Sequence, residues 1–323
     1  GGHPDKDSWH LAQVVSFLKH LMHEGAENVA FFWDFHSLEQ LPRDATQNFR
    51  FRAALKFMHA LYGHIDVQIL RLNDLPRGTN SIHTRGWPFF EEAVYSTAAK
   101  CGDIVFVCSN RSQLLSSGEP GYERSLEVLG TLKGARSLPM TPTFFQEGLQ
   151  NMKFTGKGDR DEVMKMYGQI FESGLKQNPQ VALAYIEWDV SKACQLGDAL
   201  YHYDNLMNLY IDDSISFNDE CLCELMKRAD LEGKARLCNI RFDNTGIRDV
   251  NPLSALLLRT NSLELLDLEE NPIECVQSFC QALAKNRSLK TLSMYNHRLS
   301  KESKASLHTA WTAQAGRVDR LLI

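Results

Sequence analysis

The sequence predicts an α/β protein in three parts: an N-terminal domain with a parallel sheet, a helical connector and a short C-terminal solenoid. Its 323 residues exceed what one hydrophobic core usually holds, so two domains are expected. In the N-terminal part apolar runs alternate with amphipathic segments, which is typical of a parallel sheet covered by helices. In the last third one leucine pattern recurs at a fixed spacing, which indicates stacked repeats. We place the three parts at residues 1–140, 141–213 and 214–323.

The N-terminal part predicts a βαβαβ succession that begins on a helix. Apolar side chains three and four positions apart predict helices over Trp9–His23, Phe49–Tyr62 and Pro88–Lys100. Continuous apolar runs predict buried strands over Val29–Phe35, Asp66–Leu72 and Ile104–Cys108. Functional residues of such a sheet lie in the loops beyond the carboxyl ends of its strands, here residues 34–40 and 73–87.

A change of composition marks the start of the connector. Between Gly118 and Pro142 the chain is rich in glycine, serine and proline, which indicates surface loops. From Thr143 to about Asp213 the pattern is helical, with one apolar stripe between Val163 and Phe171. The segment Val181–Leu209 has a similar pattern and is also expected to be helical. We expect this connector to pack against both of its neighbours.

The C-terminal part contains three copies of the pattern LxxLxLxxN. The copies start at Leu237, Leu263 and Leu289, so they are evenly spaced along the chain. Each copy predicts a short strand, and the helices that follow are expected over Pro252–Arg259, Val276–Lys285 and Lys301–Trp311. A degenerate unit around residues 209–226 is expected to cap the stack, because no single unit can bury its own apolar face.

The final position of the pattern is irregular. Asn271 holds the usual asparagine, whereas Thr245 and His297 stand there in the other copies. Length, phase and strand–helix alternation nevertheless agree across the copies, and together they resemble the ribonuclease-inhibitor type of leucine-rich repeat. The resemblance implies a protein built to bind other proteins. Three imperfect units form a short arc, so we expect the repeats to pack against the connector or a sister subunit.

Composition excludes several classes of protein. A formal charge of −5 gives no attraction to phosphate backbones, so nucleic acid is not an expected partner. No run of roughly 18 apolar residues predicts a membrane span, although a partner can itself be membrane-bound. The eight cysteines are scattered in apolar stretches without the paired spacing of a zinc site. We therefore expect no metal, and a reducing, cytoplasmic location.

Polar residues gather at two places in the N-terminal part. The run WDFHSLEQ covers residues 33–40, where polar groups follow a predicted strand, and Arg85-Gly86-Trp87 precedes a predicted helix. Glu91 lies four residues beyond Trp87, so both side chains share one helix face. An aromatic ring beside a carboxylate at such a place is suited to a ribosyl compound.

These runs resemble the TIR and HET family of α/β signalling domains, in the divergent form found in protists. The resemblance is carried by residues 33–40, by Met58–Tyr62 and by RGWPFFEEA at residues 85–93, and it covers roughly residues 4–110. It implies a flavodoxin-like parallel sheet and self-association into a homo-oligomer. A TIR domain opens with a strand that forms one wall of its pocket. Here that strand either lies upstream of Gly1 or is absent from the domain.

In TIR domains a tryptophan four residues before a glutamate opens the helix near the pocket, and Trp87 and Glu91 match this pair. The resemblance implies Glu91 as the catalytic residue of an NAD glycohydrolase, where it stabilises positive charge on the ribose. NAD is then a substrate, and no bound cofactor is expected. The implied ligand-binding residues, which shield the site, position the ligand or meet its phosphates, are Trp33, Asp34, Ser37, Arg85 and Trp87.

A structural interpretation of the same residues is available and is favoured. Trp87, Phe90 and Val94 fit the core face of an amphipathic helix, and Glu91 and Glu92 fit solvated first-turn acids favoured by the helix dipole. The expected function is therefore a non-catalytic signalling adaptor or scaffold, with NAD cleavage as one alternative and a structural subunit of a large assembly as another. Similar protist chains, including kinetoplastid ones, imply a flagellar or cytoskeletal location or a role in cyclic-nucleotide signalling.

Overall fold

The computed structural model describes residues 8–23, 25, 27–33, 37–39, 42–62, 69–72, 84–98, 104–107, 138–154, 156, 158–174, 177–313 and 320–323. The chain divides into two compact units, which are treated separately. The first unit comprises residues 1–91 and 102–134, and the second comprises residues 92–101 and 135–323.

The first unit contains the predicted alternation of helices and strands. Its described elements are α1 (Trp9–His23), α3 (Ala45–Tyr62), β1 (Ile69–Leu72), β2 (Ile104–Val107) and the first residues of α4 (Gly86–Ala98), a helix whose remainder is assigned to the second unit. The two strands pair in parallel, with Ile69 opposite Ile104. The predicted helices are confirmed, and so are the described parts of the last two predicted strands.

Helix α3 begins before its apolar stripe because of a capping box. The backbone N–H of Gln47 donates to Asp44 Oδ1 at 2.7 Å, and the backbone N–H of Asp44 donates to Gln47 Oε1 at 2.9 Å. Two N–H groups at the helix start are satisfied in this way.

The strand predicted over Val29–Phe35 is wrong for the residues that the structure describes. Residues 27–33 have no regular secondary structure, and Val29 and Phe31 are each 43% exposed. An apolar run indicates a preference for burial, but it does not supply the neighbouring backbone that a strand needs for its hydrogen bonds.

The second unit begins with the predicted helical connector. Helices α7 (Pro142–Leu149) and α8 (Asp159–Ser173) pack on each other, with the rings of Phe145 and Tyr167 stacked at 3.9 Å. The Tyr167 hydroxyl donates to the Met140 carbonyl at 2.8 Å, and Gln195 donates to the Leu138 carbonyl at 3.3 Å. Because Gln195 lies in the next helix of the unit, these bonds join the helix pair to the sheet layers that follow.

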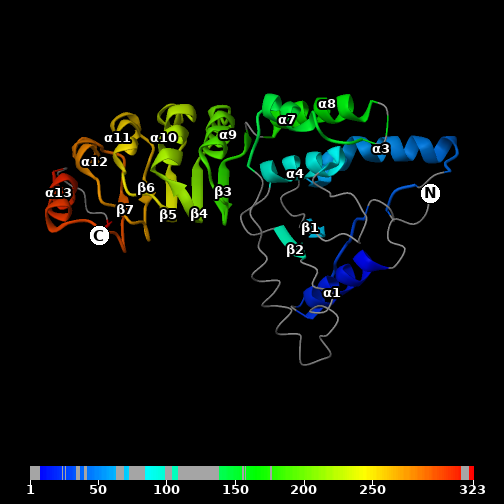
Figure 1. Cartoon of the computed structure of the whole chain (residues 1–323), viewed down its shortest axis with the longest axis horizontal. Helices are drawn as coiled ribbons and strands as arrows, with labels where there is room; N and C mark the ends of the chain where they lie inside the picture. The colour runs from blue at the N-terminus through cyan, green and yellow to red at the C-terminus, as the bar shows by residue number, and fades with distance from the viewer. Residues whose placement is uncertain are drawn as a thin grey trace. The chain divides into compact units, whose positions relative to one another are not determined.

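A six-stranded parallel sheet forms the rest of this unit, with its strands in chain order (Figure 1). The strands are β3 (Gln180–Ala184), β4 (Asn208–Asn218), β5 (Asn239–Gly246), β6 (Leu265–Asp267), β7 (Thr291–Ser293) and β8 (Leu321–Leu322). Figure 1 shows the helices between them as one layer along one side of the sheet. They are α9 (Val190–Tyr201), α10 (Asp219–Arg228), α11 (Ser254–Arg259), α12 (Gln277–Leu283) and α13 (Lys301–Thr312), with short 3-10 turns at Leu231–Gly233 and Asn251–Leu253.

The strand register reproduces the spacing of the leucine pattern. Asn239 lies opposite Leu265, which lies opposite Thr291, and each of these partners stands two positions after the first leucine of its copy. Equivalent positions of successive copies are therefore neighbours in the sheet. The degenerate unit predicted around residues 209–226 is confirmed as β4 followed by α10.

The helix expected over Val181–Leu209 is wrong, because this segment contains β3, α9 and the start of β4. Val181, Ala182 and Leu183 are all buried. A strand covered on both faces shows no polar–apolar alternation, so its sequence resembles that of a buried helix. The sheet therefore starts at Gln180, within the segment expected to be a purely helical connector.

Asn271 joins neighbouring units inside the core. Its side chain is completely buried, and its amide donates to the carbonyls of Phe242 at 2.5 Å and Glu269 at 2.9 Å. Its Oδ1 accepts from the Thr245 hydroxyl at 2.5 Å and from the Thr245 backbone N–H at 3.2 Å. Thr245, which departs from the repeat pattern, thus supplies a donor that an asparagine partner can use.

One position in five successive units has a left-handed backbone. The residues there have φ between 46° and 59°, and they are Tyr185, Asp213, Asn244, Glu270 and Asn296. The register places them in one row, because Ala184 pairs with Asp212, Asp212 with Asp243, and Asp267 with Ser293. This conformation favours glycine, asparagine and aspartate, so Tyr185 and Glu270 hold it against their intrinsic preference.

Candidate interaction site

Three of the predicted site residues lie at the start of α4. Arg85 directly precedes the helix and is exposed, whereas Trp87 and Glu91 are half-buried and lie four residues apart. The Trp87 ring meets the fully buried Phe90 edge to face at 6.0 Å, and Val94 is fully buried. The structural interpretation of Phe90 and Val94 as a core face is confirmed. The interpretation of Glu91 and Glu92 as solvated first-turn acids is wrong, because both are half-buried and the first turn of α4 contains no acidic residue.

The remaining predicted site residues lie before α3. Two hydrogen bonds join Trp33 and Ser37: the Trp33 N–H donates to Ser37 Oγ at 3.0 Å, and the Ser37 N–H donates to the Trp33 carbonyl at 2.7 Å. Asp34 lies outside the described residues. The meeting of these residues with the start of α4 at one pocket stays a prediction.

A second candidate site lies on the strand side of the second unit. Alternate residues of a strand point to opposite faces of its sheet. Leu209, Ile211, Ile240, Phe242 and Leu266 are all 0% exposed, and they form the face buried beneath the helix layer. The residues between them therefore point away from the helices.

Acidic residues dominate the middle of this strand face. In one row the register places Tyr210 opposite Arg241 and Arg241 opposite Asp267. In the next row Asp212 lies opposite Asp243, and Glu269 lies two positions after Asp267, in the turn that follows β6. Adjacent strands are about 4.8 Å apart, so these carboxylates lie close to one another. We call Asp212, Asp243, Asp267 and Glu269 the acidic rows.

The acidic rows hold one guanidinium from the chain itself. Arg241 Nε donates to Asp212 Oδ1 at 2.8 Å, and a second bond joins the Arg241 terminal nitrogen to Asp212 Oδ2. The guanidinium carbon lies 4.7 Å from the centre of the Tyr210 ring. A carboxylate and an aromatic ring together are a favourable surrounding for a planar cation.

Asp243 is less well satisfied. Its Oδ1 is buried and has no hydrogen-bond partner among the described residues. Its pKa is raised from 3.8 to about 6, mainly by burial and also by the charges of Asp267, Asp212 and Asp213, whereas the charge of Arg241 acts in the opposite direction. The pKa of Asp267 is also raised, mainly by burial. Two neighbouring carboxylates in the acidic rows are therefore in surroundings that disfavour their charged forms.

Exposed aromatic and polar side chains border the acidic rows. Tyr185 is 56% exposed and Tyr295 is 59% exposed. In the left-handed row the Asn244 side-chain amide donates to Asp213 Oδ1 at 2.9 Å, and the Asn296 amide donates to Glu270. Tyrosine is enriched in protein interfaces, because its ring supplies area and its hydroxyl supplies a polar contact.

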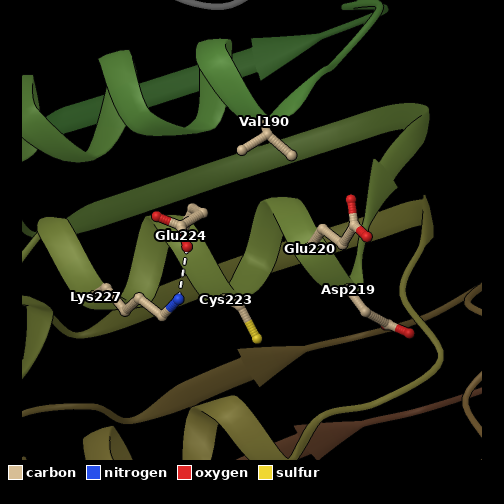
Figure 2. A pocket seen from close by; sticks show the side chains of 6 residues that line it. All are labelled: Val190, Asp219, Glu220, Cys223, Glu224 and Lys227. Atoms are coloured by element: carbon tan, nitrogen blue, oxygen red, sulfur yellow. Dashed lines mark hydrogen bonds and ion pairs between the residues drawn. The ribbon is translucent and has the colours of Figure 1, made fainter.

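A groove on the helix side of the unit carries less chemistry (Figure 2). It has a volume of about 360 Å³ and is lined by Val190, Asp219, Glu220, Cys223, Glu224 and Lys227. Lys227 pairs with Glu224 at 2.6 Å, and Asp219 Oδ1 accepts the backbone N–H groups of Arg248 and Asp249. Burial raises the pKa of the Cys223 thiol, which opposes its ionisation. These groups are engaged in holding α10 and the loop after β5, so the groove does not present a reactive group.

Several classes of site are missing from the described residues. They contain no group of three His, Cys, Asp or Glu side chains placed to hold a metal ion. The cysteines described at positions 194, 221, 223, 238, 275 and 280 are all free. None of the helices in this part of the chain is both long enough and apolar enough to cross a membrane.

Comparisons with known proteins identify no family. No family model matches the chain, and no curated protein matches it. Among solved structures, the actin-binding site 2 of leiomodin-1 is similar, with 11% identity over 46% of this chain and 88% of that chain and a TM-score of 0.33. An identity and a TM-score this low support no inference about partner or activity.

Sequence reasoning missed the acidic rows. The signal was available, since Arg241 and Asp267 occupy the same position in consecutive copies of the leucine pattern, one residue before its third apolar position. Aligning those variable positions by the repeat spacing would have placed Arg241 beside Asp267.

Proposed function

We propose that the chain is a non-catalytic adaptor or scaffold, and that its six-stranded sheet is a leucine-rich-repeat solenoid that binds protein partners through its strand face. The observation that carries the proposal is the strand face itself. It presents the acidic rows and exposed tyrosines, whereas the opposite face of strands β3 to β7 is buried.

The sheet architecture supports the solenoid. Strands in chain order, a single helix layer and a register that matches the repeat spacing are properties of stacked repeats, in which each unit contacts its neighbours. Helices α7 and α8 are suited to cover the first repeat of the sheet, which consists of β3 and α9. The ring of Phe171 on α8 lies 5.3 Å from the ring of His202, just beyond α9. Self-association through the TIR/HET-like part belongs to the same proposal.

The test compares full-length tagged variants in the cells from which the chain comes. Tyr210→Ala combined with Tyr295→Ala removes two rings from the strand face, and truncation of central aromatic residues commonly weakens binding by about 30-fold. Tyr201→Ala is the matched control, because Tyr201 is 58% exposed but lies on α9. We expect the double variant to lose a specific partner that the control retains. Equal recovery of every partner by both variants would contradict the proposal.

NAD cleavage is the second candidate, because α4 carries Trp87 and Glu91 one turn apart as the resemblance requires. It predicts nicotinamide release from NAD by the purified chain, and loss of that release in Glu91→Ala. The adaptor proposal predicts no turnover at micromolar protein and unchanged partner capture by Glu91→Ala. Loss of capture through Glu91→Ala alone would count against the adaptor.

A further inference from the structure

We infer that the acidic rows bind an arginine-bearing segment of a partner protein, with a guanidinium seated between Asp243 and Asp267. The inference rests on the proposed function and specifies the chemistry of its partner. It begins from the geometry of Arg241, which shows how this surface accommodates a planar cation.

Arg241 is an internal example of the proposed contact. Its guanidinium makes two bonds to Asp212 and lies over the Tyr210 ring. The bidentate bond matches the fork of guanidinium donors to the two oxygens of a carboxylate. A lysine ammonium is a compact, strongly hydrated charge and lacks this match, so the surface is suited to arginine in particular.

Asp243 and Asp267 lie on neighbouring strands beside this pair, and no ion pair to either is found among the described residues, although Asp267 Oδ1 accepts the Glu269 backbone N–H at 3.2 Å. Asp243 has a buried oxygen with no hydrogen-bond partner in the described part of the chain, which is costly for a charged group. The charged groups facing it are Asp212 and Asp213 from β4, Asp267 from β6 and Arg241 of its own strand. Because Arg241 is bonded to Asp212, it makes no ion pair with Asp243, and the half-buried Asp243 carboxylate is left without a bonded cation in the described part of the chain.

A protein segment fits these observations better than an inorganic cation. The described residues contain no metal-binding group of three ligands, and Asp212 has both oxygens committed to Arg241. Arginine side chains also stack on tyrosine rings, and exposed Tyr295 and half-buried Tyr210 border the acidic rows. Charge complementarity therefore selects a positively charged partner.

The first test measures binding of fluorescent hexa-arginine to the full chain at physiological salt and pH 7.5. The variant Asp243→Asn/Asp267→Asn removes two charges from the acidic rows. Glu147→Gln/Glu274→Gln removes two charges from exposed positions elsewhere, so both proteins have the same net charge. We expect about a tenfold weakening in the first variant, because each lost bond involved charged groups. The control is expected to stay within twofold of the wild type.

Two further measurements test the preference for arginine and the role of the Asp243 charge. Hexa-lysine is expected to bind several-fold more weakly than hexa-arginine, and equal binding would overturn the assignment to arginine. Lowering the pH from 7.5 to 5.5 protonates Asp243, whose pKa is about 6, so wild-type binding is expected to weaken several-fold. In Asp243→Asn this pH response is expected to be much smaller.

Equal weakening by both double variants would overturn the inference, since it would mean that net charge alone attracts the peptide. Thermal unfolding midpoints close to that of the wild type show that each variant is folded. The two proposals can fail separately. If Tyr210→Ala/Tyr295→Ala abolishes capture of the cellular partner and Asp243→Asn/Asp267→Asn does not, the strand face binds a partner of different chemistry. If neither variant affects capture, both proposals fall.

Discussion

Substitution of Asn271 by alanine tests whether the repeats are held together through their core. In the folded protein the Asn271 side chain is completely buried, and it bonds to Phe242 and Thr245 of the preceding unit. The substitution removes all of these bonds and leaves the Phe242 carbonyl and the Thr245 N–H without this partner. A buried group left unsatisfied costs about 1–3 kcal/mol, so we expect a loss of about 3–5 kcal/mol in the free energy of unfolding.

The assay is urea unfolding of the full chain at neutral pH, with amide hydrogen exchange to localise the change. We expect protection to fall at Thr245 and at its neighbours in β5 and β6, where the lost bonds lie. Asn261→Ala is the control, because Asn261 is exposed, and its effect is expected to stay within about 0.5 kcal/mol. A loss below about 1 kcal/mol in Asn271→Ala, or a loss equal to that of the control, would refute the reasoning.

Three further substitutions probe the strand face and its border. Tyr185→Asn is expected to stabilise the protein by about 0.5–1 kcal/mol, because asparagine tolerates the φ of 58° at this position; a lower thermal midpoint would contradict this. Arg241→Lys replaces the two-bond contact to Asp212 by a single charge. We expect the free energy of unfolding, measured in urea, to fall by about 1–2 kcal/mol. The expected loss is small because the Arg241 side chain is 40% exposed and solvent screens its charge. Asp243→Asn is expected to raise the urea midpoint at pH 7.5 and to leave it nearly unchanged at pH 4. The folded-state pKa of about 6 exceeds the ordinary value of 3.8, so the free energy of unfolding falls as the pH rises through this window, and a midpoint that falls at pH 7.5 would refute the assignment.

Much of the second unit is predictable because burial leaves a periodic trace in the sequence. The evenly spaced leucine pattern located β5, β6 and β7, and the weaker unit before them was confirmed as β4 and α10. The prediction was wrong at β3, because Val181, Ala182 and Leu183 are all buried and their sequence does not alternate between polar and apolar residues. It failed again at residues 29–33, whose apolar side chains are not part of a strand.

The acidic rows leave no such trace of burial and become visible only when the variable positions of successive repeats are aligned. Packing determines which positions are apolar, but it leaves the side chains on the open face of a sheet free to vary. Asp212 and Asp243 are separated by a complete repeat unit along the chain, as are Arg241 and Asp267, so their proximity exists only once the strands are stacked in register. By contrast, Trp87 and Glu91 are close in sequence, and their placement on one helix was predictable from spacing alone.

Substitutions of Asn271 and of Asp243 are expected to change the free energy of unfolding in opposite directions. This difference distinguishes a side chain that holds the fold together from one that serves ligand binding. Both side chains have buried polar atoms and lie on neighbouring units, but Asn271 has partners for its amide and its oxygen, whereas Asp243 Oδ1 has none among the described residues. A substitution that removes a satisfied polar group destabilises the fold, and one that removes an unsatisfied charge stabilises it. A side chain that weakens the folded state at neutral pH is typical of a binding site, where stability is exchanged for affinity. If Asp243→Asn both stabilises the chain and weakens hexa-arginine binding, the carboxylate serves the ligand and not the fold.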